Sequence, residues 1–412
     1  MQKQKPLWPK VFLLLAALLF SACSELNDVL GPSFTISLSP TELNTTQGGF
    51  ANTQLTITPK NDFTGGRVYL SLVGPPNGVS LSPESVWVGS SGATKTLTIS
   101  TTEGTPTGQH TLTLKATSGS TQKTATLILA VNTPEFTVNT DADTTDKTPG
   151  NGRCEDASGQ CSLRAAVMEA NALNAPAVIN IPAGTYRLTL QSYEDEKGGD
   201  LDIDSNVTLK GAGADRTFLD GNAAYRVLEI YEGRKVSVEG VTIQNGKASY
   251  YDGGGIYNSG TLTLKDSTVS GNRTNYGGGG IYNLGTLTLT NTTVSGNTAG
   301  GSGGGIYNNG GSLTLTGSTV SGNTASIYNY GGGIYNYRGS LILKDSTVSG
   351  NSASYGGGIY NEDSTPTLTN TTVSGNRASG SGGGIYNLGT LTLTNSTVSG
   401  NTAGVDGGGI LN

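Results

Sequence analysis

The sequence predicts an all-β protein in two parts, a β-sandwich followed by a parallel β-helix with three strands per coil and a short N-terminal capping helix. Three observations predict this fold. Residues 34–132 contain short alternating apolar runs between turn residues, and the later part of the chain repeats one motif about every 25 residues. A segment with helical periodicity lies between the two patterns.

Composition excludes several classes of function. The chain has 412 residues, of which 13% are charged, and its formal net charge is -6. The chain lacks the excess of positively charged residues that binds a nucleic-acid backbone, so we expect no nucleic-acid partner. His110 is the only histidine, which excludes a histidine-based metal cage and a Ser/His/Asp triad.

Residues 1–22 have the features of an export signal. Three lysines precede the apolar run from Val11 to Phe20, which is too short to remain in a bilayer as a spanning helix. The segment Leu19-Phe20-Ser21-Ala22-Cys23 resembles the lipobox of bacterial lipoproteins. This resemblance implies a lipid on Cys23 that anchors the chain in a membrane, at the cell surface or outer membrane. The alternative is an ordinary signal peptide.

Residues 23–33 are interpreted as a linker and residues 34–132 as an Ig-like β-sandwich. Seven alternating runs support the sandwich, at residues 34–38, 55–58, 68–73, 86–88, 97–99, 110–115 and 125–131. About seven strands in roughly 100 residues, with no helical period, are typical of such a fold. We interpret the module as a spacer and Trp87 as a core or rim aromatic. Ligand binding by the module is the alternative.

Residues 133–177 form a junction with a predicted capping helix. Ser162 is a suitable N-cap for this helix. Four apolar residues would share one face of it: Leu163, Ala166, Val167 and Ala170. Such a helix can cover the apolar end of the first coil of a solenoid. Cys154 and Cys161 are close in sequence, and a disulfide between them would stabilise the junction by about 2–3 kcal/mol.

The same junction resembles a known family. Cys161-Ser162-Leu163-Arg164-Ala165-Ala166 is similar to the CSLREA motif that opens a family of bacterial secreted β-helix proteins, with Ala165 in place of the motif's Glu. The resemblance covers roughly residues 136–245. It implies an exported β-helix protein and assigns no activity.

Residues 178–412 are predicted to form the β-helix. The motif GGxIYN, or a close form of it, recurs with its isoleucine at Ile256, Ile281, Ile306, Ile334, Ile359, Ile385 and Ile410. A TLTLxxSTVSGN-like segment lies between successive copies. Each unit therefore holds three short β runs separated by Gly, Asn or Asp, which corresponds to one coil of a parallel β-helix.

Stacked coils would place identical residues in columns. The asparagines of GGxIYN should form a structural ladder of side-chain amides, through Asn258, Asn283, Asn308, Asn336, Asn361 and Asn387. The repeat and the CSLREA-type junction both resemble right-handed, pectin-lyase-like β-helix proteins. The GGxIYN and SGN motifs also resemble the repeats of chlamydial-type polymorphic outer membrane proteins.

This uniform repeat favours a non-catalytic function. We expect a lipid-anchored surface protein that presents the β-helix as an adhesive rod, with a polysaccharide or another cell-surface protein as partner. The candidate glycan platform is an outward tyrosine column, Tyr257, Tyr282, Tyr307, Tyr335, Tyr360 and Tyr386. The alternative is that these tyrosines stack only for packing.

An enzyme is the second hypothesis, as a polysaccharide lyase or hydrolase of the pectin-lyase-like class. Asp200, Asp202 and Asp204 alternate along one segment and could share a strand face where Ca²⁺ binds. A solvated loop is the alternative for this segment. No convergent acid/base set stands out in the repeats, so no catalytic residue is assigned, and Ca²⁺ is the single cofactor considered.

Overall fold

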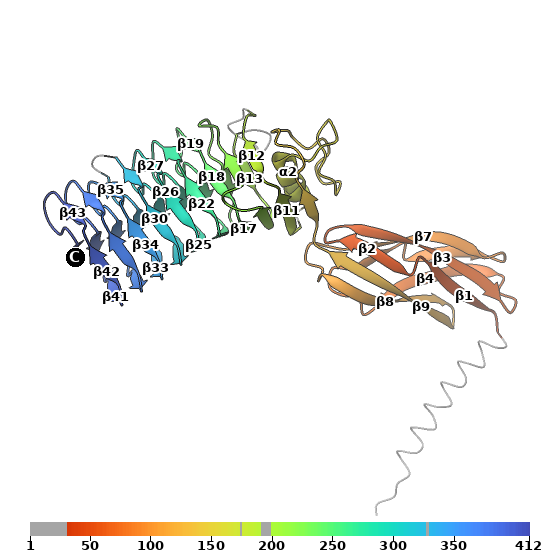
Figure 1. The fold of residues 1–412 in the computed structure, drawn as a ribbon. Coiled ribbons are helices and arrows are strands. Elements are labelled where there is room, and N and C mark those ends of the chain that lie inside the picture. The colour runs from red at the N-terminus through yellow and green to blue at the C-terminus, as the bar shows by residue number, and fades with distance from the viewer. Residues whose placement is uncertain (1–30, 174, 191–198, 327–328) are drawn as a thin grey trace, which may run out of the picture. The chain divides into compact units, whose positions relative to one another are not determined.

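The computed structural model describes residues 31–173, 175–190, 199–326 and 329–412 (Figure 1). The chain divides into two compact units, Met1–Thr133 and Pro134–Asn412, which are described separately. Cys23 and the predicted export signal lie outside the described residues. Within those residues, no helix has the length and apolar character needed to cross a membrane.

The N-terminal unit consists of two sheets that share one hydrophobic core. The first sheet is antiparallel, with the order β1 (Ser33–Ser39), β3 (Phe50–Lys60), β7 (Ala93–Ser100), β5 (Ser80–Ser82). The second sheet has the order β2 (Glu42–Thr46), β9 (Thr121–Asn132), β8 (Gly108–Ser118), β4 (Gly65–Val73), β6 (Ser85–Gly89). In this second sheet β2 pairs with β9 in parallel and the remaining pairs are antiparallel.

Alternation along these strands creates the core. Leu97 and Ile99 of the first sheet and Leu112 and Leu114 of the second belong to one buried cluster. The sequence pattern missed β2 and β5, because both are short and rich in polar residues, which leaves little apolar alternation to detect.

The second unit is a parallel β-helix whose coils form long sheets. The first sheet has ten strands: β10 (Glu135–Thr137), β11 (Ala177–Ile181), β14 (Val207–Gly211), β17 (Lys235–Glu239), β21 (Thr261–Lys265), β25 (Thr286–Thr290), β29 (Ser312–Thr316), β33 (Ser340–Lys344), β37 (Thr367–Thr369) and β41 (Thr392–Thr394). The next sheet has nine: β12 (Gly184–Arg187), β15 (Thr217–Asp220), β18 (Thr242–Gln244), β22 (Thr268–Ser270), β26 (Thr293–Ser295), β30 (Thr319–Ser321), β34 (Thr347–Ser349), β38 (Thr372–Ser374) and β42 (Thr397–Ser399).

Two further sheets complete the coils. The third has nine strands: β13 (Leu201–Ile203), β16 (Leu228–Ile230), β20 (Ile256–Asn258), β24 (Ile281–Asn283), β28 (Ile306–Asn309), β32 (Ile334–Tyr337), β36 (Ile359–Glu362), β40 (Ile385–Leu388) and β44 (Ile410–Leu411). The fourth has seven: β19 (Lys247–Ala248), β23 (Arg273–Thr274), β27 (Thr298–Ala299), β31 (Thr324–Ala325), β35 (Ser352–Ala353), β39 (Arg377–Ala378) and β43 (Thr402–Ala403).

From β19 onward each coil therefore has four strands, which corrects the predicted three. The additional strands are only two residues long, so they show no alternation that a sequence pattern could detect. Each still contributes one inward side chain, such as Thr274, which is 1% exposed, and Ala299, which is 0% exposed.

Coils pair in register, so equivalent residues form columns. Ile256 pairs with Ile281, and Leu262 with Leu287, across strands that lie about 4.8 Å apart. These four side chains are fully buried. The aliphatic columns run along the whole interior, which makes one continuous core of the second unit.

Two ladders of asparagine side chains accompany the aliphatic columns. In the first, Asn258 donates to Asn283 at 2.6 Å, and the same bond continues through Asn308, Asn336, Asn361 and Asn387. In the second, the corresponding bonds join Asn272, Asn297, Asn323, Asn351, Asn376 and Asn401. The Oδ1 atom of Asn258 has no partner among the described residues, because Ile230 occupies the equivalent position in the preceding coil.

The glycine triplets next to the ladders have two physical causes. Gly331 has a φ of 63°, a conformation that residues with a Cβ rarely adopt. A Cβ on Gly333 would lie 2.7 Å from the carbonyl oxygen of Gly358 and 2.9 Å from Nδ2 of Asn351. The triplet therefore permits both the turn and the close approach to the ladder.

The helix α2 (Leu163–Leu173) covers the first coil, as Figure 1 shows. The Oγ atom of Ser162 accepts a hydrogen bond from the backbone N–H of Ala165 at 3.0 Å, the geometry of an N-cap. The side chain of Asn171 bonds the backbone of Asp202 and of Asp204. The helix is thus fixed to the strand that begins the third sheet.

The loop before α2 is held by covalent and electrostatic contacts. Cys154 and Cys161 form a disulfide. Arg164 and Asp143 form an ion pair with 2.6 Å between Nε and Oδ1, and their side chains are 1% and 2% exposed. The same guanidinium donates to the backbone carbonyls of Gly199 at 2.7 Å and Asp200 at 2.9 Å. The arginine of the CSLREA-like segment therefore joins the loop, the helix and the first coil.

Candidate functional site

The tyrosine column lies on the third sheet of the β-helix. Register joins Tyr257, Tyr282, Tyr307, Tyr335, Tyr360 and Tyr386 in one row, with one residue from each coil. The same row continues toward the first coil through Glu229 and then Asp202. The row therefore begins with two carboxylates and continues with six aromatic rings.

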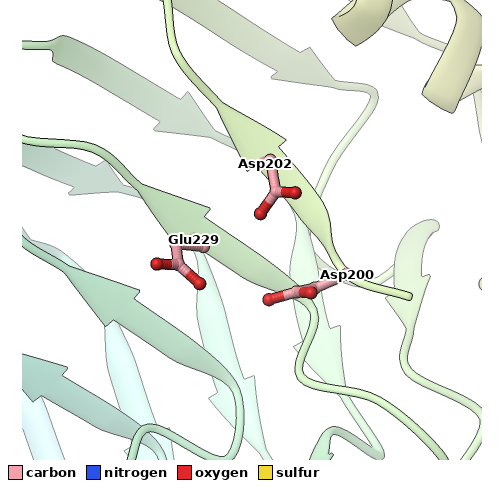
Figure 2. Close-up of side chains that lie close together, drawn as sticks. All are labelled: Asp200, Asp202 and Glu229. Carbon is pink, nitrogen blue, oxygen red and sulfur yellow. The ribbon is translucent and has the colours of Figure 1, made fainter. Parts of the chain in front are cut away.

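Asp200, Asp202 and Glu229 form an acidic cluster at the start of this row. Figure 2 shows Asp202 and Glu229 on neighbouring strands with Asp200 beside them. Carboxylate oxygens of the three residues lie within 4.8 Å of one another. Asp202 is buried, whereas Asp200 and Glu229 are partly exposed.

Arg226 neutralises part of this cluster. Its Nε atom lies 2.7 Å from Oδ2 of Asp200, and it also pairs with Glu229. The guanidinium carbon lies 5.2 Å from the ring centroid of Tyr257, within the range of a cation–π contact. Arg226 therefore connects the acidic cluster to the first ring of the tyrosine column.

The predicted calcium set needs correction. Asp204 does not join Asp200 and Asp202, because β13 ends at Ile203 and the Asp204 carboxylate pairs with Arg234 at 2.8 Å. Glu229 takes its place in the cluster. Ca²⁺ prefers oxygen ligands such as these three carboxylates, but Arg226 already balances two of them. These contacts fit an ion-pair network better than a cation site.

Most of the surface of the tyrosine column is buried by packing, and little of it is exposed to solvent. Tyr282, Tyr335 and Tyr360 are only 8%, 6% and 6% exposed. Consecutive rings contact one another with centroids 4.6–5.4 Å apart, the range of stacked or edge-to-face pairs. Tyr330, from a loop, also lies 4.6 Å from Tyr360. Burial of these rings argues against a glycan platform made of the whole column.

The loops that precede the third sheet expose other tyrosines. Tyr250, Tyr251 and Tyr276, which we name the loop tyrosines, are 75%, 62% and 49% exposed. They adjoin the acidic cluster through Asp252. The carbonyl of Asp252 accepts a bond from Arg226 at 3.3 Å, and its carboxylate accepts one from the N–H of Gly277 at 2.7 Å. Burial raises the pKa of the Asp252 carboxyl.

Sequence patterns alone do not reveal two residues of this region, Glu229 and Arg226, because the first coils diverge from the repeat. A usable signal was present, because Leu201-Asp202-Ile203 and Leu228-Glu229-Ile230 have the spacing of Ile256-Tyr257-Asn258. Alignment of these three triplets places the side chains of Asp202 and Glu229 in the tyrosine row.

Packing of the column predicts alkaline destabilisation of the β-helix. Burial is the main cause that raises the pKa of Tyr307 from 10.0 to about 12. The stability contributed by its neutral phenol is fully present below pH 10 and is lost as the pH rises through about 12. We expect urea midpoints to fall over this interval, and tyrosinate absorbance to appear with unfolding. The variant Tyr307→Phe should lose less stability there, and an equal loss would contradict the assignment.

The structure defines a parallel β-helix protein with an acidic and aromatic row on one sheet. Residues 345–362 and 370–388 match the Chlamydia polymorphic membrane protein repeat. These segments span β34 to β36 and β38 to β40 together with the intervening turns, so the similarity concerns the repeat unit. The search of the curated proteins found no match.

One solved structure is similar in part, a Bacteroides ovatus GH5 xyloglucanase in complex with a XXXG heptasaccharide. The alignment covers 51% of this chain and 46% of that one, with 9% identity and a TM-score of 0.19. The chain thus matches less than half of that enzyme's length. A TM-score this low supports no conclusion on fold or function.

Proposed function

We propose that the chain is a lipid-anchored, non-catalytic cell-surface protein that presents its β-helix to bind glycans. The observation that carries this proposal is the group of exposed loop tyrosines beside carboxylates at one edge of the β-helix. Aromatic rings offer apolar faces to the C–H faces of sugars, and carboxylates accept hydrogen bonds from sugar hydroxyls. Because the carboxylates would repel uronates, the expected ligands are uncharged glycans.

Four features support the location and architecture in this proposal. The lipobox-like segment at Cys23 supports lipid anchoring, and the repeat similar to polymorphic membrane proteins supports display at the outer membrane or cell surface. The two-sheet N-terminal unit supports an Ig-like module between anchor and β-helix. The CSLREA-like junction supports export of the whole chain.

Replacing the loop tyrosines should remove glycan binding. We expect the variant Tyr250→Ala/Tyr251→Ala/Tyr276→Ala to bind uncharged glycans about tenfold or more weakly, because exposed aromatic anchors carry much of a contact's free energy. A glycan array identifies the ligand, and calorimetry then measures its Kd. Tyr231→Ala is a matched control. Tyr231 is 39% exposed and follows the C-terminal end of β16, whereas the loop tyrosines precede the strands of the third sheet.

Two results would contradict the glycan proposal. The first is an array on which the chain retains no uncharged glycan. The second is equal affinity in the chain and in the variant that lacks the loop tyrosines. Circular dichroism of that variant should match the original, because all three side chains are exposed.

A polysaccharide lyase or hydrolase is the second candidate, favoured by the acidic cluster and Arg226. Paired carboxylates can serve as acid and base on a glycosidic bond. Against this, the Arg226 guanidinium is occupied by Asp200 and Glu229. Cleavage of polygalacturonate, alginate or a neutral glucan by the purified chain, abolished in Glu229→Gln, would support the enzyme and displace the non-catalytic proposal.

A further inference from the structure

The N-terminal unit carries two large aromatic side chains on its surface. Trp87, at the centre of β6, is 73% exposed, and Tyr69, on β4, is 59% exposed. Their strand neighbours Val88 and Leu70 are 0% and 4% exposed. Because successive side chains of a strand point to opposite faces, both rings project from the outer face of the second sheet. This corrects the interpretation of Trp87 as a core or rim aromatic.

The register places these rings side by side. Trp87 pairs with Arg67, and Tyr69 pairs with Ser85, in the antiparallel ladder of β4 and β6. Trp87 and Tyr69 are therefore diagonal neighbours on one face, a separation that aromatic side chains can bridge. Single exposed apolar residues are common on protein surfaces, but an adjacent pair of large rings is characteristic of a contact surface.

The charges around the two rings favour an acidic ligand. Arg67 lies opposite Trp87, and Lys115 on β8 pairs with Ser71 on β4, so two cations flank the rings on the same face. β4, β6 and β8, all fully described, contain no acidic residue. Neither Arg67 nor Lys115 makes an ion pair with any residue that the structure describes. β6 is also the edge strand of the sheet, which leaves the side of Trp87 open to an extended polymer.

We propose that Trp87, Tyr69, Arg67 and Lys115 form a binding surface for an acidic polysaccharide. The two rings receive the apolar faces of consecutive sugar residues. The Arg67 guanidinium binds a uronate carboxylate through paired N–H donors, and Lys115 adds a second positive charge. The N-terminal unit is then a binding module as well as a spacer. This site is independent of the loop tyrosines, whose acidic surroundings favour uncharged glycans.

Polygalacturonate is the probe for this site, with a neutral glucan for comparison. Trp87 is one of two tryptophans, and the other, Trp8, precedes the predicted cleavage site. In the exported chain, the fluorescence of Trp87 therefore reports directly on this surface. We expect polygalacturonate to change the emission, and Trp87→Ala/Tyr69→Ala to weaken binding about tenfold or more in affinity electrophoresis. Arg67→Gln should weaken binding and reduce its dependence on salt.

Two controls separate this site from the proposed function. Phe50→Ala removes an aromatic that is 65% exposed on β3 of the other sheet, and it should leave binding unchanged. The variant without the loop tyrosines should retain the full fluorescence response to polygalacturonate, even if its binding to neutral glycans is lost.

Three results would overturn the proposal. One is no response to polygalacturonate, and another is equal binding by the chain and by Trp87→Ala/Tyr69→Ala. The third is a change of sedimentation from dimer to monomer in that variant with polysaccharide binding intact, which would assign the surface to contact between two copies of the chain.

Discussion

Replacement of Arg164 by methionine should destabilise the β-helix by about 3–5 kcal/mol, the usual cost of breaking a buried ion pair. The Asp143 carboxylate is 2% exposed at its side chain, so removal of the guanidinium leaves a buried charge without its cation. The carbonyls of Gly199 and Asp200 lose donors in the same substitution. Backbone N–H groups of Thr189 and Leu190 still bond Asp143, but they carry no formal charge to balance it.

Urea unfolding of the two units can be followed separately. Tyr69 is the only tyrosine in residues 1–133, so the near-ultraviolet dichroism of the remaining tyrosines follows the β-helix, whereas Trp87 fluorescence follows the N-terminal unit. Arg164→Met should lower the urea midpoint of the β-helix, followed by tyrosine dichroism. It should leave the midpoint of the N-terminal unit, followed by Trp87 fluorescence, unchanged. Arg234→Met is the matched control, because its pair with Asp204 is 33% and 50% exposed and should contribute below about 1 kcal/mol. Similar shifts in both variants would contradict a special role for burial.

The repeat made most of the β-helix predictable, since its identities are consequences of stacking. Ile256 and Leu262 recur because a parallel in-register sheet places each under its copy in the next coil, where only similar volumes pack well. The two-residue strands such as β23 were not predictable, because two residues cannot define a period. The bend that precedes β23 lies at Gly271, whose φ is 65°, and the strand begins two residues later.

The candidate site was less predictable than the fold, for two physical reasons. Alternation predicts that Tyr335 lies in a column on the face opposite Ile334, but it does not reveal that Tyr330 packs against the ring of Tyr335. The coil that contains Glu229 diverges from the repeat, so its register with Tyr257 became visible only in three dimensions. Outward direction in a strand and exposure to solvent are separate properties wherever loops fold over a sheet.

Exposed loops also explain why the proposed binding of uncharged glycans depends on few residues. Stacking fixes the interior of every coil, so variation is tolerated at the loop tips that precede the third sheet. Tyr250 and Tyr276 lie at such tips, close to the coil where Arg226 meets Tyr257. A site of this kind requires no change in the repeat itself, which is consistent with the uniform asparagine ladders beneath it.

Substitution of Asn323 by alanine should destabilise the β-helix by about 2–4 kcal/mol, because buried donors are left without acceptors. The Oδ1 atom of Asn323 accepts hydrogen bonds from the backbone N–H of Asn297 at 3.0 Å and from its Nδ2 at 2.9 Å. Its own Nδ2 donates to the carbonyl of Val294 at 2.9 Å and to Asn351 at 3.0 Å. All of these asparagines are 0% exposed, so water cannot replace the lost partners without entering the core.

Tyrosine dichroism in urea measures this loss, with Asn275→Ala as the control. Asn275 is exposed three residues after Asn272, a member of the same ladder, and its Nδ2 makes one bond, to the carbonyl of Ser249 at 2.9 Å. Its removal should change the free energy of unfolding by less than about 0.5 kcal/mol. Equal effects of the two substitutions would mean that the buried ladder contributes no more than a surface amide. A larger effect at Asn323 is the expected result, because one missing side chain removes bonds to both neighbouring residues in a chain of bonds that crosses six coils.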